Sequence, residues 1–239
     1  MLAMAALSVA TWNLNNCAGK RQFRPETADA AIALGADIIV FTEFFPQEAE
    51  ERFKAALAQA GLHNQLFTQS KIANRVLIVS KLPLQSLPLE LPTFDQQFPA
   101  NVLGVRFPSI GLSIVGARIP WYSSETKTAD LRPLAWEWLK RTADSLKHGP
   151  AIIIGDFNVQ ASAKIFRRTF AEPWHRATHE EVTFVGYRGK KSEIDHIIAT
   201  DHCIFSEVRV EKNALSDHAA LVCRVKLPDM RTFTPPLQR

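Results

Sequence analysis

The sequence predicts a mixed α/β fold with an α+β middle section, built as one domain. Short apolar runs rich in β-branched residues alternate with helical patterns, and the middle of the chain holds short strand-like runs separated by prolines and polar turns. A chain of 239 residues with 46% hydrophobic content can bury a substantial core, and no repeat or linker divides it. We therefore expect a single domain over 1–239, with 228–239 as a loosely held tail.

The first part of the chain reads as two strand-and-helix pairs. The first strand alternates between apolar and polar residues and ends in Asn13, and the second, fully apolar strand ends at Glu43. Each helix has a proline at its first turn and a glycine after its last turn, which are common start and stop signals. The expected elements are strands at 8–13 and 37–41 and helices at 25–34 and 46–60.

The middle of the chain, 66–119, changes to an antiparallel pattern. Its apolar runs are short and lie between proline-bearing turns, which suits strands joined by tight connections. An amphipathic helix is expected next, with Leu134, Trp138 and Leu139 facing the core. The strands are expected at 76–80, 102–105 and 112–115, and the helix at 126–146.

A buried strand at 151–154 ends in two polar side chains. Gly155 lets the backbone bend, and Asp156 and Asn158, two positions apart on extended chain, point the same way. Both residue types are also common in turns that close a strand, so a turn and a functional site are both open at this point. Further elements are expected as a short helix at 161–170 and strands at 193–199, 204–210 and 219–225.

Composition and charge narrow the class of protein. The net charge of +4 and a pI near 9.0 favour an anionic partner. Arg188, Lys190 and Lys191 cluster in a glycine-containing loop before a strand, although an ordinary solvated turn explains them equally. Cysteines that are few and scattered indicate a reducing compartment, so we expect a cytoplasmic protein. No apolar run approaches the roughly 20 residues of a membrane helix, and the segment 1–7 lacks the basic start of a secretion signal.

Polar residues recur at the ends of the apolar strands. A turn explains any one of them, but acids and amides placed repeatedly at strand ends indicate one shared site. Oxygen ligands without cysteine suit a hard divalent ion, Mg²⁺ or Mn²⁺, better than zinc. The residues in question are Asn13, Glu43, Asp156, Asn158, Asp195, Asp217 and His218.

The chain resembles the endonuclease/exonuclease/phosphatase superfamily, which includes exonuclease III, apurinic/apyrimidinic endonucleases, DNase I, sphingomyelinases and inositol-polyphosphate phosphatases. Short motifs that carry the resemblance follow the family's order along nearly the whole chain. The resemblance implies a four-layer αββα sandwich, in which two mainly antiparallel β-sheets pack face to face between helices, with the site at one edge. The matching motifs are Thr11-Trp12-Asn13, Thr42-Glu43, Gly155-Asp156-Phe157-Asn158, Ile194-Asp195-His196 and Ser216-Asp217-His218.

The resemblance also implies a metal side of the site. Glu43 is similar to the principal metal ligand, Asn13 to a neighbour in or next to the metal shell, and Asp217 to a further metal-side acid. The ion, Mg²⁺ or Mn²⁺, polarises a phosphoryl oxygen and offsets charge on the leaving oxygen. Asn15 falls where some relatives place an acid, so a second metal position is expected to be weaker here.

On the catalytic side, the resemblance implies metal-assisted, in-line hydrolysis of a phosphate ester. His218 is similar to the family's phosphate-facing histidine, and Asp195 to the carboxylate that orients it and favours its protonated form. Asp156 is expected to position or deprotonate the attacking water, and Asn158 to donate a hydrogen bond to the phosphate. Which group takes the proton is open, because coupled acids titrate as a set.

One position departs from the family. Arg118 stands where many relatives carry a histidine or tyrosine, before the predicted long helix. A guanidinium can bind phosphate but cannot serve as an acid near neutral pH, so we expect Arg118 to contact substrate phosphate. The alternative is a strand-end salt bridge, with Tyr122 bending back to do the phosphate-binding work.

The substrate is left open by the family, and three features favour a nucleic acid, with DNA as our expectation: the basic pI, Lys191 in its basic loop, and Trp121 with Tyr122, which can stack on a base. The two aromatic residues can equally cap the core. We therefore expect a monomeric, metal-dependent nuclease without membrane contact. A phosphatase or phosphodiesterase for a lipid headgroup or small phosphorylated molecule is the alternative, and a non-catalytic nucleic-acid-binding module is disfavoured because the acids and the histidine are all present.

Overall fold

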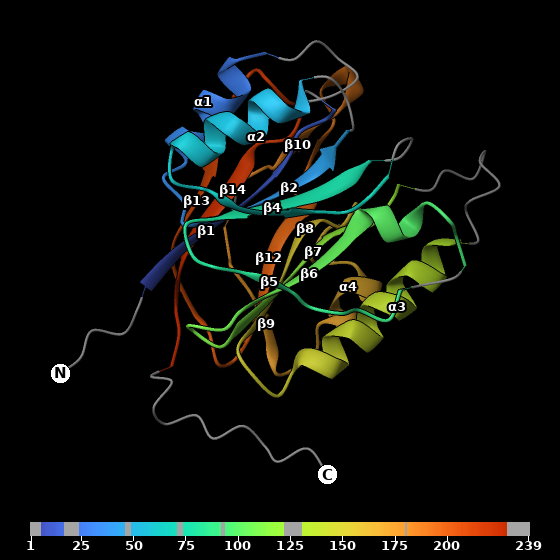
Figure 1. Ribbon diagram of the computed structural model, residues 1–239. Helices are drawn as coiled ribbons and strands as arrows, with labels where there is room; N and C mark the ends of the chain where they lie inside the picture. The colour runs from blue at the N-terminus through green and yellow to red at the C-terminus, as the bar shows by residue number, and fades with distance from the viewer. Residues whose placement is uncertain are drawn as a thin grey trace.

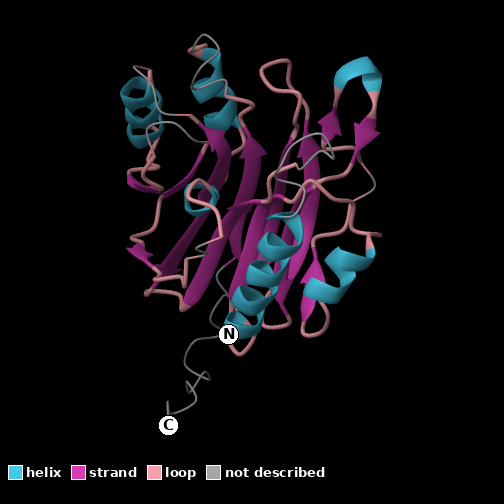
Figure 2. Ribbon diagram, turned by 90° about the vertical axis from the view of Figure 1, so that its right-hand side faces the viewer, coloured by secondary structure: helices cyan, strands magenta, loops and turns pink. Residues whose placement is uncertain are grey.

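The computed structural model describes residues 6–16, 24–45, 49–70, 74–91, 94–121, 131–179 and 181–228. Two six-stranded sheets pack face to face, with α1 and α2 against the outer face of one and α3 and α4 against the outer face of the other (Figure 1). Viewed from the side, the strands gather in the middle of the molecule (Figure 2). The predicted four-layer αββα sandwich is confirmed.

The first sheet, which we call sheet 1, has the strand order β13-β14-β1-β2-β4-β3. Every neighbouring pair is antiparallel except β1 and β2, which are parallel and joined through α1. The strands are β1 (Ala6–Asn13), β2 (Ile38–Phe44), β3 (Asn64–Phe67), β4 (Arg75–Ser80), β13 (Ile204–Glu211) and β14 (Ala220–Lys226).

The second sheet, sheet 2, has the order β5-β6-β7-β8-β12-β9 and is again antiparallel except for one pair, β7 and β8. A separate hairpin joins β10 and β11. The strands are β5 (Gln85–Ser86), β6 (Val102–Phe107), β7 (Leu112–Arg118), β8 (Ala151–Asp156), β9 (Trp174–Arg176), β10 (Phe184–Val185), β11 (Lys191–Ser192) and β12 (Asp195–Thr200).

The helices cover the outer faces with narrow apolar stripes. In α2, Phe53 and Leu57 are buried against sheet 1, and in α3, Trp138 and Leu139 are buried against sheet 2. Leu134, expected in the core, is 41% exposed, because it lies on the face of α3 that turns to solvent. The helices are α1 (Glu26–Ala33), α2 (Glu50–Gln59), α3 (Leu131–Leu146) and α4 (Lys164–Thr169), with 3-10 turns η1 (Phe98–Asn101) and η2 (Tyr187–Gly189).

β-Branched residues from both sheets fill the space between them, which is why the central strands read as continuous apolar runs. Gly116 on β7 sets how closely the sheets approach near the end of that strand. A Cβ at this position would lie 2.7 Å from Val40 Cγ1 and 2.8 Å from Val76 Cγ1, both on the facing sheet. The close approach brings the ends of β1, β2, β7, β8 and β12 together, and the predicted site residues lie at these ends.

Three predicted segments lie partly outside the described residues. The undescribed part of the chain includes residues 46–48, expected to begin the second helix, residues 126–130, expected to begin the long helix, and residues 229–239 of the expected tail. The single-domain bounds of 1–239 therefore stay a prediction. Within the described ranges, none of the helices has the length and apolar character needed to cross a membrane.

Candidate active site

The stretch that ends β8 forms a turn, and this turn positions the predicted site residue Asp156. Gly155 has φ +142°, and a Cβ there would lie 2.0 Å from the backbone oxygen of Ala117, so only glycine fits between the strands. Beyond it, the Asp156 Oδ1 accepts a 2.9 Å hydrogen bond from the backbone N–H of Asn158, which adopts φ 51°. This Asx-type turn fixes the orientation of a carboxylate that is 1% exposed.

Amide groups hold the second oxygen of Asp156. The Asn13 side chain, which reaches across from β1, donates its Nδ2 to Asp156 Oδ2 at 3.0 Å, and Asn158 Nδ2 donates to the same oxygen at 3.0 Å. The Asn158 Nδ2 also donates to the Ile119 backbone oxygen at 2.9 Å. Both N–H groups of the Asn158 amide are therefore engaged by the protein. Asn158 orients Asp156 in this geometry, and the predicted donation to phosphate requires one of these bonds to break.

Burial and the neighbouring Asp195 carboxylate raise the pKa of Asp156 to about 7, against opposing effects of His218 and Arg118. Asp156, Arg118 and Asp195 lie at one level of sheet 2, because Asp156 pairs in register with Arg118 on one side and with Asp195 on the other. A carboxyl group with a pKa near 7 exchanges its proton near neutral pH. That is the property a general base for water requires.

His218 and Asp195 form a buried pair between the two sheets. The His218 Nδ1 lies 2.8 Å from Asp195 Oδ2, and the two residues are 6% and 0% exposed. Burial alone would lower the pKa of His218, but the charge and hydrogen bond of Asp195 raise it to about 9, so the ring is a cation at neutral pH. Nδ1 donates to Asp195, which leaves Nε2 as the ring's remaining donor.

Further hydrogen bonds hold the backbone of Asp195 and His218 in place. Thr183 Oγ1 accepts the backbone N–H of Asp195 at 3.2 Å, and Ser216 Oγ accepts the backbone N–H of His218 at 3.1 Å. Trp12 Nε1 donates to the His218 backbone oxygen at 3.1 Å, and the Phe184 ring lies 4.6 Å from the imidazole, centroid to centroid. Position and charge of the histidine are therefore both fixed by the protein.

Glu43 and Arg118 form a second ion pair between the sheets, on the other side of Asp156. The Arg118 Nε and Nη2 both contact Glu43 Oε1, at 2.9 and 2.8 Å, while Glu43 Oε2 accepts, among the described residues, only a 3.3 Å hydrogen bond from Asn16 Nδ2. Glu43 sits at an irregularity of β2 with φ 52°. The salt-bridge alternative for Arg118 is thus observed, and its contact with phosphate stays a prediction.

The other predicted residues lie around this cluster. Asp217 is exposed beside His218, and its backbone oxygen accepts the N–H of Val185 in the β10–β11 hairpin at 2.9 Å. Lys191 is exposed on that hairpin, and Trp121, beyond the end of β7, is 67% exposed, so it does not cap the core. Tyr122 lies outside the described residues.

Sequence reasoning missed some residues that shape the site. Asn101, in a proline-bearing 3-10 turn before β6, has its Oδ1 3.5 Å from Arg118 Nη1. Its place directly before a strand was the only signal. Thr183, which supports Asp195, gave none, because a threonine before an aromatic residue is unremarkable in a β-rich chain.

The donors present fit a hard divalent ion. Among the described residues, no three acidic, histidine or cysteine side chains come together as a metal cluster. Mg²⁺ does not require such a cluster, since it commonly binds one or two carboxylates and keeps several waters that substrate phosphates replace. Glu43 offers an oxygen, Oε2, that accepts one long hydrogen bond from the described residues, and the Asn13 amide lies at the end of the adjacent strand β1. Their roles as ligands, with Asp217, stay predictions.

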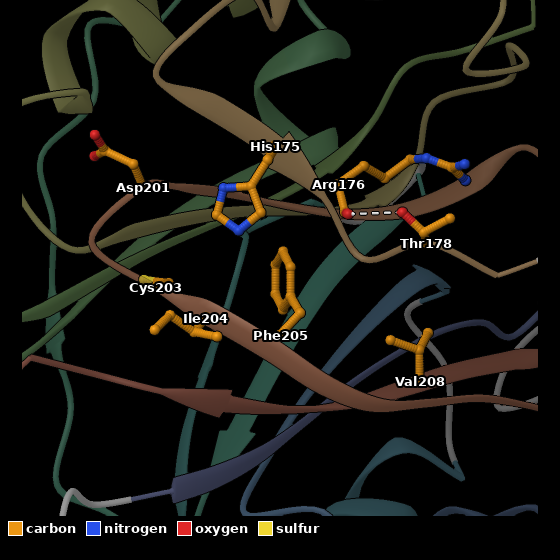
Figure 3. Close-up of a pocket in the computed structure, with 8 residues that line it drawn as sticks. All are labelled: His175, Arg176, Thr178, Asp201, Cys203, Ile204, Phe205 and Val208. Atoms are coloured by element: carbon orange, nitrogen blue, oxygen red, sulfur yellow. Dashed lines mark hydrogen bonds between the residues drawn. The ribbon is translucent and has the colours of Figure 1, made fainter.

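An open hollow of about 510 Å³ lies away from this cluster (Figure 3). It is lined in part by His175, Asp201 and Phe205, near the end of β12 opposite to Asp195. The His175 ring packs 5.1 Å from the Phe205 ring, centroid to centroid. The hollow contains none of the predicted site residues.

Known proteins share the sequence pattern and the fold of this chain. The family model described as "Endonuclease/Exonuclease/phosphatase family" matches residues 10–218, a span that includes every motif above. No curated protein matches the chain.

Solved structures share the fold at low sequence identity. A 3'-5' exonuclease, NExo, from Neisseria Meningitidis has a TM-score of 0.73 and 21% identity, covering 91% of this chain and 98% of that one. An AP endonuclease from Archaeoglobus fulgidus has a TM-score of 0.72 and 17% identity, with the same coverage of 91% and 98%. An endonuclease/exonuclease/phosphatase from Beutenbergia cavernae DSM 12333 has a TM-score of 0.71 and 16% identity, covering 93% and 72%. The chain belongs to the endonuclease/exonuclease/phosphatase family, whose members are hydrolases of phosphate esters.

Proposed function

We propose that the protein is a divalent-metal-dependent nuclease that hydrolyses DNA phosphodiester bonds by in-line attack of an activated water. The observation that carries the proposal is the geometry of two buried groups at one edge of the sandwich, a carboxylate held by two amides and a histidine held by a second carboxylate, and the pKa values of both groups are raised. Asp156 has a pKa near 7, and His218, held by Asp195, has a pKa near 9. A base for water and a fixed cation for phosphate thus lie at the same edge of the sandwich.

Each residue of the cluster has a distinct task in this proposal. Asp156 accepts the proton of the attacking water, and Asn13 and Asn158 hold its carboxylate in place. His218 Nε2 donates to a phosphate oxygen, and Asp195 keeps the ring charged and oriented. When bound, Mg²⁺ or Mn²⁺ polarises the phosphoryl oxygen and stabilises charge on the leaving oxygen. Glu43, Asn13 and Asp217 are its proposed ligands.

Exposed groups around the site support a nucleic acid as substrate. Trp121 offers a ring for base stacking, and Lys191 and Lys190 present positive charge on the hairpin that pairs with the segment around His218. The net charge of +4 acts in the same direction. Among proteins of this fold, the Neisseria 3' phosphatase NExo was solved bound to a product DNA hairpin, at 22% identity.

The test is incubation with Mg²⁺ and a panel of single-stranded, nicked, abasic and supercoiled DNAs, RNA, and lipid and inositol phosphates, with EDTA as the metal-free control. We expect Mg²⁺-dependent cleavage of at least one DNA, with binding that weakens steeply as salt rises. Product length separates cleavage at ends from cleavage in the interior. Hydrolysis of lipid or inositol phosphates without cleavage of any DNA contradicts the nuclease assignment, and hydrolysis of none of these compounds contradicts the phosphoesterase assignment.

A further inference from the structure

Glu43, the proposed metal ligand, already has a cation beside it. The Arg118 guanidinium contacts it at 2.8 Å, and the two side chains are 17% and 14% exposed. We propose that Arg118 is a built-in cation that shares the Glu43 carboxylate with the metal ion and weakens the site's affinity for that ion. This inference rests on the proposed metal-dependent function.

The geometry of the pair permits sharing. Both Arg118 donors, Nε and Nη2, converge on Oε1, whereas a two-pronged arginine–carboxylate contact would occupy both oxygens. Within the part of the chain that the structure describes, Oε2 is left with the single 3.3 Å bond from Asn16. One carboxylate can therefore hold a guanidinium on one oxygen and a divalent ion on the other.

Arg118 has one contact that does not depend on Glu43. It ends β7 in register with Asp156, and the next residue, Ile119, donates its backbone N–H to the Asp156 backbone oxygen at 2.8 Å. The Nη1 lies 3.5 Å from Asn101 Oδ1. Strand pairing fixes the backbone of Arg118, and in the proposal the guanidinium stays beside Glu43 when an ion binds.

The positive charge of Arg118 is expected to lower the affinity of the site for a metal ion. A fixed positive charge next to the ligand repels the ion, and in a half-buried site this repulsion is less screened than in water. Arginine keeps its charge throughout the usable pH range, so the penalty is constant. Removing the charge is therefore expected to tighten Mn²⁺ binding by about tenfold.

The experiment measures Mn²⁺ binding by calorimetry without any substrate, in the full chain. Arg118→Gln and Arg118→Met both remove the charge, and methionine adds no oxygen ligand of its own. Arg118→Lys keeps the charge but loses the guanidinium shape. Arg106→Gln is the matched control, because Arg106 is exposed on β6 and pairs with Ser113, at the opposite end of β7 from Arg118. We expect about tenfold tighter binding in the Gln and Met variants and wild-type affinity in the Lys and Arg106 variants.

Melting temperature supplies a second measurement that separates this role from a structural one. Without metal, the neutral variants are expected to melt lower than wild type, because Glu43 loses its partner. With Mn²⁺, their gain in melting temperature is expected to exceed that of wild type, because a tighter ligand stabilises more. If Arg118 has only a structural role, the neutral variants melt lower without metal but do not gain more melting temperature with Mn²⁺ than wild type does.

Unchanged or weaker Mn²⁺ binding in both neutral variants overturns the inference. Failure of one neutral variant to fold leaves the decision to the other, and failure of both overturns the inference in favour of a structural role. A wild-type protein that binds no Mn²⁺ and hydrolyses no phosphate ester removes the proposed function itself. A wild type that is active, with variants of unchanged affinity, removes only the role given to Arg118.

Discussion

Two ion pairs join the sheets at the active edge, and they differ in how completely the protein encloses them. His218 and Asp195 have side chains that are 7% and 1% exposed, and their backbone groups form hydrogen bonds with the side chains of a threonine, a serine and a tryptophan. The side chains of Arg118 and Glu43 are 17% and 14% exposed, and one oxygen of the Glu43 carboxylate has a single long hydrogen bond from the described residues. We call His218 and Asp195 the enclosed pair, and Arg118 and Glu43 the open pair. The enclosed pair holds the charge of His218, whereas the open pair is proposed to take a metal ion as a further ligand.

Local structure explains the difference. His218 follows Ser216, whose Oγ donates to the Asn13 backbone oxygen at 2.8 Å and so ties the segment to β1. The hairpin strand β10 covers the imidazole through Phe184. Glu43 instead lies where the pairing of β2 with β4 shifts register, and its backbone adopts φ 52°. A bulge of this kind re-aims a side chain at a strand end.

The largest expected effect follows from removing the enclosed pair. His218→Ala takes away the phosphate-facing cation and leaves the Asp195 carboxylate buried without a partner. Activity is expected to fall by about a thousandfold or more, and the free energy of unfolding by about 3–5 kcal/mol. Initial rates and urea denaturation measure the two changes. A stable variant would contradict the description of the pair as enclosed.

The enclosed pair also predicts how stability depends on pH. The folded pKa of His218 is about 9, above its ordinary value of 6.5, so its contribution is fully present below pH 6.5 and is lost as pH rises through 9. The loss is on the order of 3 kcal/mol. The folded pKa of Asp156 is raised from 3.8 to about 7, so its contribution to stability is lost as pH rises through 7. This loss is complete at a lower pH than the loss that His218 causes.

Urea denaturation of the metal-free protein between pH 7 and 10 tests this dependence. His218→Gln is expected to flatten the decline above pH 7, while Glu43→Gln leaves the decline in place. An equally steep decline in His218→Gln assigns the effect to another group and removes the pKa argument.

Breaking the open pair is expected to cost less stability than breaking the enclosed pair. Glu43→Gln keeps the shape of the side chain and an oxygen, so the free energy of unfolding without metal should change by only about 1 kcal/mol. Metal binding and Mg²⁺-dependent hydrolysis should nevertheless be lost, because a neutral amide is a poor ligand for a hard ion. Calorimetry with Mn²⁺ and urea denaturation check both statements. A stability loss as large as that of His218→Ala removes the distinction between the pairs.

The smallest effect is expected outside both pairs. Trp121 is 67% exposed and supports no part of the core, so Trp121→Ser should leave the melting temperature unchanged. If the ring stacks on a base, DNA binding weakens by about tenfold. Fluorescence anisotropy with labelled DNA and catalytically inactive protein measures this change, and unaltered affinity excludes the stacking role.

Much of the fold could be predicted because its signals are local. Apolar runs of β-branched residues marked the central strands, and proline and glycine marked helix ends. Asp156, Asp195 and Arg118 were found because each ends or begins a strand, and the pairing of β7, β8 and β12 then aligned them. Leu134 was misplaced because a helix pattern does not say which edge of its stripe meets the sheet.

The contacts between the sheets could not be predicted from local patterns. Glu43 and Arg118 are 75 positions apart, and Asn13 and Asp156 are 143 apart. Their pairing depends on how closely the sheets stack, which Gly116 helps to set. The double engagement of the Asn158 amide likewise depends on Ile119, on a neighbouring strand end. Residue types and strand ends indicated which residues form the candidate site. The hydrogen-bond partner of each residue is determined by how the two sheets pack.

The central claim is that Asp156 activates water beside the charged His218. Asp156→Asn keeps the side-chain volume and removes the base, so the most direct measurement compares Mg²⁺-dependent cleavage of labelled DNA by wild type and this variant under single-turnover conditions. We expect the variant to fold and bind DNA, with a cleavage rate lower by about a thousandfold or more. Cleavage at the wild-type rate by a folded Asp156→Asn protein would contradict the account.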